Sequence, residues 1–154
     1  MFETNQHVKS VAVTHCFNSE KVNSRNWRLL HESCVNELIE CCPNIRSLKL
    51  NSLQVNSDTF NDKSNIPLPN LTHLHLSHNY YLEPKLMMSI ASKCCNLTQL
   101  WVTGEISHGD TEDWDKAFST LLQKCWGTLT HLQFDAFLLS DEAFKVLKYL
   151  YMYV

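Results

Sequence analysis

The sequence predicts an α/β fold in a single domain over residues 1–154. We expect an arc-shaped solenoid with parallel strands on its concave face and helices on its convex face. A phrase of three apolar residues, the second three positions after the first and the third two positions later, recurs five times. Between the phrases, apolar residues recur every three or four positions, as in helices that bury one side. With 44 % hydrophobic residues and only three glycines, the composition is typical of an ordered domain with a core.

The recurring phrase predicts the strands. "NLTHLHL" at 70–76 returns as "NLTQLWV" at 96–102 and "TLTHLQF" at 128–134, with looser copies "NIRSLKL" at 44–50 and "HVKSVAV" at 7–13. Each phrase ends in the alternating pattern of a short strand with one buried face. The resulting repeat units cover about residues 8–44, 45–70, 71–96, 97–128 and 129–154. The apolar triplets are Val8/Val11/Val13, Ile45/Leu48/Leu50, Leu71/Leu74/Leu76, Leu97/Leu100/Val102 and Leu129/Leu132/Phe134.

The phrase matches the leucine-rich-repeat consensus, in which an asparagine or cysteine follows three positions after the last apolar residue. Asn79 occupies this position in the third unit and Cys16 in the first. A small polar side chain there satisfies backbone groups that are buried where the chain turns under the sheet. The other units have Leu53, Glu105 and Phe137 in this position, so we expect less regular turns there.

Four stretches between the phrases predict helices, at 26–42, 83–95, 111–125 and 140–153. Pro84 suits the first turn of the second helix. Thr111 and Ser140 are candidate caps of the third and fourth helices, and acidic residues follow in the first turn of the third. The polar segment 56–69 contains two prolines and predicts a loop or one short turn.

Several phrases resemble the cysteine-containing leucine-rich repeats of F-box proteins, in which a helix ends in cysteine shortly before the next strand. They are "ECCPNIRSLKL" at 40–50, "KCCNLTQLWV" at 93–102, "KCWGTLTHLQF" at 124–134 and, at the start of a helix, "LLSDEAFKVL" at 138–147. The resemblance covers about residues 8–150. It implies a protein-binding module that recognises substrates for an F-box-type (SCF) ubiquitin ligase.

In F-box proteins a separate helical module binds the adaptor Skp1. Seven residues precede the first predicted strand, so we expect a Skp1 partner only if an F-box exists outside this chain. The chain ends in the apolar "YLYMYV", whereas a solenoid needs polar caps. We therefore expect a fragment, a truncated gene model, or an end that pairs with another segment.

Between the apolar anchors, the strand residues are predicted to form rows on the concave face, with neighbouring strands about 5 Å apart. One row is Ser10, Ser47, His73, Gln99 and His131; the next is Ala12, Lys49, His75, Trp101 and Gln133; the last is Thr14, Asn51, Ser77, Thr103 and Asp135. Trp101 is the best candidate for an interface anchor, unless a flanking loop covers it. The predicted partner-binding residues are Lys49, His73, His75, Gln99, Trp101, His131, Gln133 and Asp135.

The histidines raise the alternative of a metal site. His73 and His75 lie about 7 Å apart on one strand, and a site needs a third ligand. His131 is two strands away, about 10 Å, and His78 lies in the turn. We therefore expect polar contacts with a partner, a pH-sensitive contact as the intermediate hypothesis, and neither metal nor cofactor.

The seven cysteines favour buried free thiols. Their number is odd, two pairs are adjacent and no secretion signal is visible, so we expect a reducing compartment, cytoplasmic or nuclear. No Cys-x-x-Cys pair or glycine-rich phosphate loop occurs, which argues against an enzyme. A net charge of −3 and the lack of a long apolar run predict neither nucleic acid nor membrane as a partner.

The segment 104–115 lengthens the fourth unit and carries five acidic residues. Either it binds a basic partner segment, as insertions in solenoids often lie on a binding face, or it is the solvated start of a helix. For the whole chain, the leading hypothesis is substrate recognition for a ubiquitin ligase. The alternative is a scaffold or regulatory binding protein unrelated to ubiquitination, and a metal- or thiol-dependent enzyme ranks last.

Overall fold

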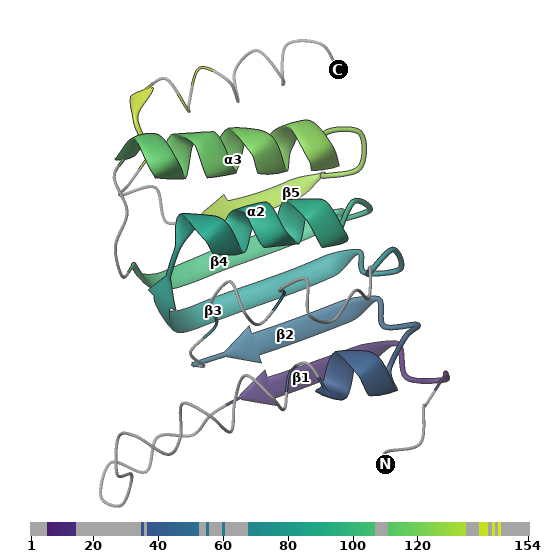
Figure 1. Ribbon diagram of the computed structural model, residues 1–154. Helices are drawn as coiled ribbons and strands as arrows, with labels where there is room; N and C mark the ends of the chain where they lie inside the picture. The colour runs from purple at the N-terminus through teal and green to yellow at the C-terminus, as the bar shows by residue number, and fades with distance from the viewer. Residues whose placement is uncertain are drawn as a thin grey trace, which may run out of the picture.

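The computed structural model describes residues 6–14, 35, 37–52, 55, 60, 68–106, 111–134, 139–141, 143 and 145. It shows an α/β fold with a five-stranded parallel sheet whose strands are ordered as in the chain, β1-β2-β3-β4-β5 (Figure 1). All five strands lie at the positions of the recurring phrase, as predicted. They are β1 Ser10–Thr14, β2 Ser47–Asn51, β3 His73–Leu82, β4 Gln99–Ile106 and β5 His131–Phe134.

Each of the strands β2 to β5 begins with the same backbone hydrogen bonds. A carbonyl just before one strand accepts from two successive amides of the next, at 2.7–3.0 Å. This pattern places equivalent residues of neighbouring strands side by side. The first four residues of every strand therefore pair without a register shift. The acceptors are Lys9, Arg46, Thr72 and Thr98, and the donors are Arg46/Ser47, Thr72/His73, Thr98/Gln99 and Thr130/His131.

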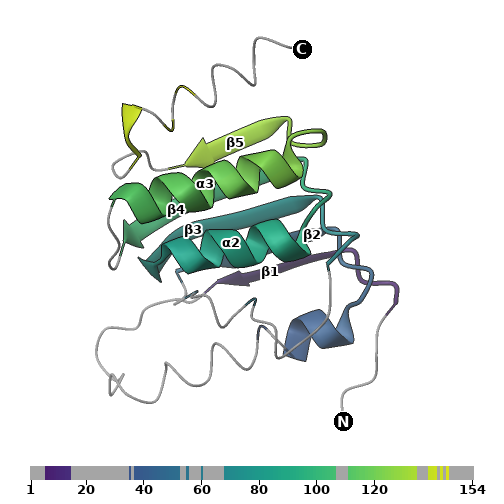
Figure 2. The same ribbon diagram turned by 45° about the horizontal axis from the view of Figure 1, so that its top comes forward.

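The helices lie on one face of the sheet (Figures 1 and 2). They are α2 Pro84–Lys93 and α3 Thr111–Cys125, close to the predicted 83–95 and equal to the predicted 111–125. Residues 35 and 37–41 are also helical, as are 141, 143 and 145. Residues 42 and 140 of the predicted helices 26–42 and 140–153 are not helical, and the remaining residues of these two predictions lie outside the described residues. Pro84 is in the first turn, as predicted, whereas Thr111 already belongs to the helix.

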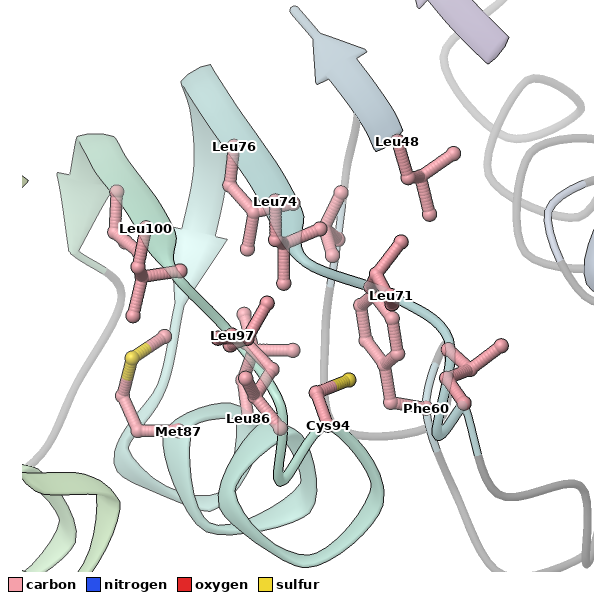
Figure 3. Close-up of a cluster of buried hydrophobic side chains, with 14 of the residues drawn as sticks. Leu48, Phe60, Leu71, Leu74, Leu76, Leu86, Met87, Cys94, Leu97 and Leu100 are labelled. Atoms are coloured by element: carbon pink, nitrogen blue, oxygen red, sulfur yellow. The ribbon is translucent and has the colours of Figure 1, made fainter. Parts of the chain in front are cut away.

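The core fills the space between the sheet and the helices. Leucines of β3 and β4 point toward α2, where Leu86 and Met87 belong to the same buried cluster, and Leu48 of β2 lies nearer Leu71 (Figure 3). Phe60, from the segment predicted to be a polar loop, is also almost fully buried and lies beside Leu71 (Figure 3). The loop prediction therefore missed an apolar anchor, because one phenylalanine among polar residues leaves no periodic signal.

Aromatic side chains connect α3 to β5. The rings of Trp114 and Phe118 lie 5.9 and 5.3 Å from the ring of Phe134, measured between centroids. Trp114 and Phe118 are buried, while Phe134 is half-buried. These tilted contacts are the arrangement that aromatic pairs prefer, and they hold the last described strand against the helix layer.

The pairing of β3 with β4 departs from the simple register. Leu76 pairs with Val102, the next pair is Asn79 with Gly104, and the one after is Leu82 with Ile106, so β3 has one extra residue in each of these two intervals. His78 has a positive φ of 53°, as expected within such a bulge. The predicted third row, with Ser77 beside Thr103, is therefore wrong at this point, and Asp135 of the same row lies outside the described residues.

Asn79 is fully buried, and its side-chain amide donates to the carbonyl oxygen of Leu50 at 3.0 Å. This confirms the prediction that it satisfies a buried backbone group, although it does so from within β3. Gly104 has φ +151°, and its backbone lies against that of Asn79. Glu105, predicted in an irregular turn, belongs to β4. Cys16, Leu53 and Phe137 lie outside the described residues.

Candidate protein-binding face

The sheet presents two rows of side chains on the face opposite the helices. The register places Ser10, Ser47, His73, Gln99 and His131 in one row, and Ala12, Lys49, His75, Trp101 and Gln133 in the other, as predicted. In β2, β3 and β4 they alternate with buried leucines and one valine, and in β1 and β5 with half-buried apolar residues. We call Lys49, His73, His75, Gln99, Trp101, His131 and Gln133 the histidine–tryptophan face. It brings together seven of the eight predicted binding residues; the eighth is Asp135.

Trp101 is at the centre of this face. Its indole lies 3.8 Å from the imidazole of His75, measured between ring centroids, with 35° between the planes. Both side chains are half-buried, whereas Lys49 and Gln133, at the two sides of the pair, are exposed. The neighbouring strand thus supports one surface of the indole and leaves part of it accessible, an arrangement suited to an apolar contact with a partner.

The surroundings of His75 favour its neutral form. Partial burial lowers the pKa of His75 most, and the positive charge of Lys49 and the nearby His73 lower it further. At neutral pH the indole of Trp101 therefore stacks on an uncharged imidazole.

His73 is oriented by the residue that precedes it. The Thr72 hydroxyl lies 2.7 Å from His73 Nδ1 and donates to the carbonyl oxygen of Arg46 at 3.1 Å. Nδ1 of His73 is therefore engaged with the Thr72 hydroxyl, which leaves Nε2 as the other ring nitrogen.

The same arrangement occurs at the other side of the face. The Thr130 hydroxyl donates to the carbonyl oxygen of Thr98 at 3.0 Å and lies 2.9 Å from His131 Nδ1. This role of the threonines was not predicted from the sequence. The signal available was the dipeptide Thr-His, which begins a strand at 72–73 and at 130–131; a third copy, at 14–15, follows the first predicted strand instead.

The described residues contain no group of three histidine, cysteine, aspartate or glutamate side chains that could hold a metal ion. Comparison of the chain with protein-family models, curated proteins and solved structures gave no match. In the part of the chain that the structure describes, no helix has the length and hydrophobicity to cross a lipid bilayer.

The described cysteines differ in exposure. Cys42, Cys94 and Cys125 are buried, Cys41 is half-buried and Cys95 is exposed. Cys94 lies in the core on the helix side of the sheet (Figure 3), and burial raises its pKa strongly. Burial and the neighbouring Cys95 raise the pKa of Cys125 to about 11. The thiols of Cys94 and Cys125 are therefore protonated at neutral pH, which makes them poor nucleophiles.

The predicted acidic loop 104–115 is mostly regular structure. Residues 104–106 belong to β4 and 111–115 to α3, and residues 107–110 lie outside the described residues. Glu112 and Asp113 are exposed at the start of α3, where carboxylates favour the helix dipole. Asp115 instead accepts from the backbone amide of Ser140 at 3.0 Å and from its hydroxyl. This role of Asp115 was not predicted either.

Proposed function

We propose that the chain is a leucine-rich-repeat solenoid that binds a protein partner through the histidine–tryptophan face and has no catalytic activity of its own. The observation that carries the proposal is the row Lys49, His75, Trp101 and Gln133, which places a half-buried indole between polar side chains on a sheet face. Tryptophan is enriched among the residues that dominate binding energy, and a polar rim around such a residue is typical of interfaces.

Three features support the solenoid. Parallel strands in chain order, entered through the same hydrogen bonds, are expected when one unit is stacked repeatedly. The asparagine of each "NLT" phrase also contacts the preceding unit: Asn70 Nδ2 lies 3.5 Å from Asn44 Oδ1, and Asn96 Nδ2 donates to the carbonyl of Pro69 at 2.8 Å. These contacts give the recurring phrase a structural role in connecting neighbouring units.

The more specific proposal is substrate recognition for an F-box-type ubiquitin ligase. It rests on the helix-ending cysteine phrases, of which Cys42, Cys94 and Cys125 are buried as core residues just before β2, β4 and β5. If the natural gene product carries an F-box, affinity purification of that full product is expected to recover Skp1 together with a partner. Recovery of a partner without Skp1 would refute the ubiquitin-ligase role, while the more general proposal of a protein-binding module would stand.

The binding face itself is tested by comparing three tagged proteins expressed in the same cells. We expect Trp101→Ala combined with His75→Ala to lose the partners that the unmodified chain recovers. The matched control is Met88→Ala on α2, because Met88 is a large apolar residue, 43 % exposed, on the helix side. Quantitative mass spectrometry gives the partner sets. Partners retained by the double variant, with circular dichroism showing an intact fold, would refute the proposed face.

A further inference from the structure

Among the side chains that the structure describes, charge is distributed unevenly between the strands and the helical segments. The chain has a net charge of −3, yet the strand positions whose side chains the structure describes hold no carboxylate and one lysine, Lys49, which is exposed; the side chain of Glu105, near the end of β4, lies outside this described set. Lys9 and Arg46, directly before β1 and β2, are exposed as well. The described carboxylates lie on helical segments or between β3 and α2; they are Glu37, Glu40, Glu83, Glu112, Asp113, Asp115 and Asp141.

The histidines of the face add to this asymmetry. His75 lies next to Lys49 in the register and stacks on Trp101. Lys49 and His73 disfavour a positive charge on His75, so an approaching anion would relieve that repulsion and an approaching cation would add to it. His73 and His131 each use Nδ1 in a hydrogen bond to a threonine, which leaves Nε2 as the ring nitrogen able to contact a partner.

We propose that the partner segment recognised by this face is an acidic peptide with one apolar side chain, which contacts Trp101 while a carboxylate lies near Lys49 and His75. The proposal rests on the proposed protein-binding function and specifies its ligand. Complementary charge favours such a segment, and desolvation of the exposed part of the indole favours the apolar contact.

The spacing of the strands gives the expected spacing in the peptide. Lys49 and Trp101 are two strands apart, which corresponds to about 10 Å, and an extended peptide advances about 3.3 Å per residue. A peptide crossing the strands would therefore carry its acidic residue about three positions from its apolar residue. A basic segment is the competing occupant, and it is an outcome of the same experiment.

A random peptide library serves as the probe, so the natural partner need not be identified first. A phage library of random 12-residue peptides is selected on the immobilised full chain and, in parallel, on Trp101→Ala. Peptides that require Trp101 are synthesised, and their affinities are measured by fluorescence anisotropy. We expect these peptides to share an aspartate or glutamate about three positions from an aromatic or aliphatic residue, and to bind less tightly as salt is added.

Matched lysine variants test the position of the carboxylate. Lys49→Ala should weaken binding about two- to fivefold, the effect of one exposed ion pair, and Lys49→Glu should weaken it further. Lys85→Ala, an exposed lysine on α2, should leave the affinity unchanged. Replacing the peptide's acidic residue by its amide should remove the difference between the original chain and Lys49→Ala.

The outcomes separate the two proposals. If the selected peptides require Trp101 but are neutral or basic, the proposal of an acidic ligand is overturned, while the proposed binding face stands. Equal loss of affinity in Lys49→Ala and Lys85→Ala would also overturn it, because general charge rather than this face would then determine binding. If no selected peptide requires Trp101, both the ligand and the proposed face are overturned.

Discussion

Gly104 is a position where the described structure requires a residue without a β carbon. A β carbon added there would lie 2.8 Å from the backbone nitrogen of Asn79 and closer still to its carbonyl oxygen. Both atoms belong to a paired strand, so they cannot move aside as a flexible side chain would. The φ of +151° adds backbone strain for any residue with a β carbon. Strain of about 1–3 kcal/mol and over-packing of about 1–3 kcal/mol predict that Gly104→Ala lowers the free energy of unfolding by about 2–6 kcal/mol.

Gly127→Ala is the matched control, because a β carbon at Gly127 has no atom within 4 Å. Urea unfolding is followed by circular dichroism for both variants. With a slope of about 2 kcal/mol per molar urea, the midpoint for Gly104→Ala should fall by about 1–3 M. The control should stay within about 0.5 kcal/mol of the original chain. Equal midpoints for the two variants would show that the contact with Asn79 does not require glycine, and would refute this account of the bulge.

Three further predictions concern protons, thiols and a helix start. The lowered pKa of His75 means that the unfolded chain binds the proton more readily, so stability is lost as pH falls below about 6.5. The free energy of unfolding is measured by urea titration at pH 7.5 and 5.5, and His75→Gln should lose less of it at the lower pH than the original chain does. Equal losses in the two proteins would contradict this prediction. Cys95 is exposed and should react with a thiol reagent at once. Cys125, with its pKa raised to about 11, should react only on unfolding. Equal reaction rates for the two thiols would disprove the burial of Cys125. Asp115→Ala removes the acceptor of two Ser140 hydrogen bonds and should cost about 1–3 kcal/mol in urea unfolding, whereas an unchanged midpoint would show that these bonds contribute nothing.

The strands and the two rows of the face could be predicted because their signal is local. In each phrase the apolar residues must reach the core, so their spacing alone determines which neighbours face the other way. Lys49, His75 and Trp101 could therefore be placed in one row from the sequence pattern. The helices 83–95 and 111–125 followed from the same kind of periodicity, combined with Pro84 and the acidic first turn.

The features that could not be predicted depend on contacts between distant residues. Gly104 is informative only once Asn79 of the adjacent strand is known to lie against it, and Gly104 itself belongs to no periodic pattern. The bulge at His78 shifts the register by one residue, which the apolar triplets cannot report because they end at Leu76. The sequence predicts Asp115 either in a segment that binds a basic partner or at the solvated start of a helix, and its contact with Ser140 spans 25 positions in the chain.

The alternation of buried and outward residues along the strands also determines how the proposed binding can be separated experimentally from folding. The buried leucines stabilise the sheet whatever occupies the positions between them, since those side chains point away from the core. Lys49, exposed and between two leucines that are fully buried, can therefore change charge at little cost in stability. His75 and Trp101 stack on each other, so replacing either one removes a contact within the fold as well as a surface for the partner. Charge variants of Lys49 are thus the cleaner test of what the face binds, while variants of Trp101 test whether it binds at all.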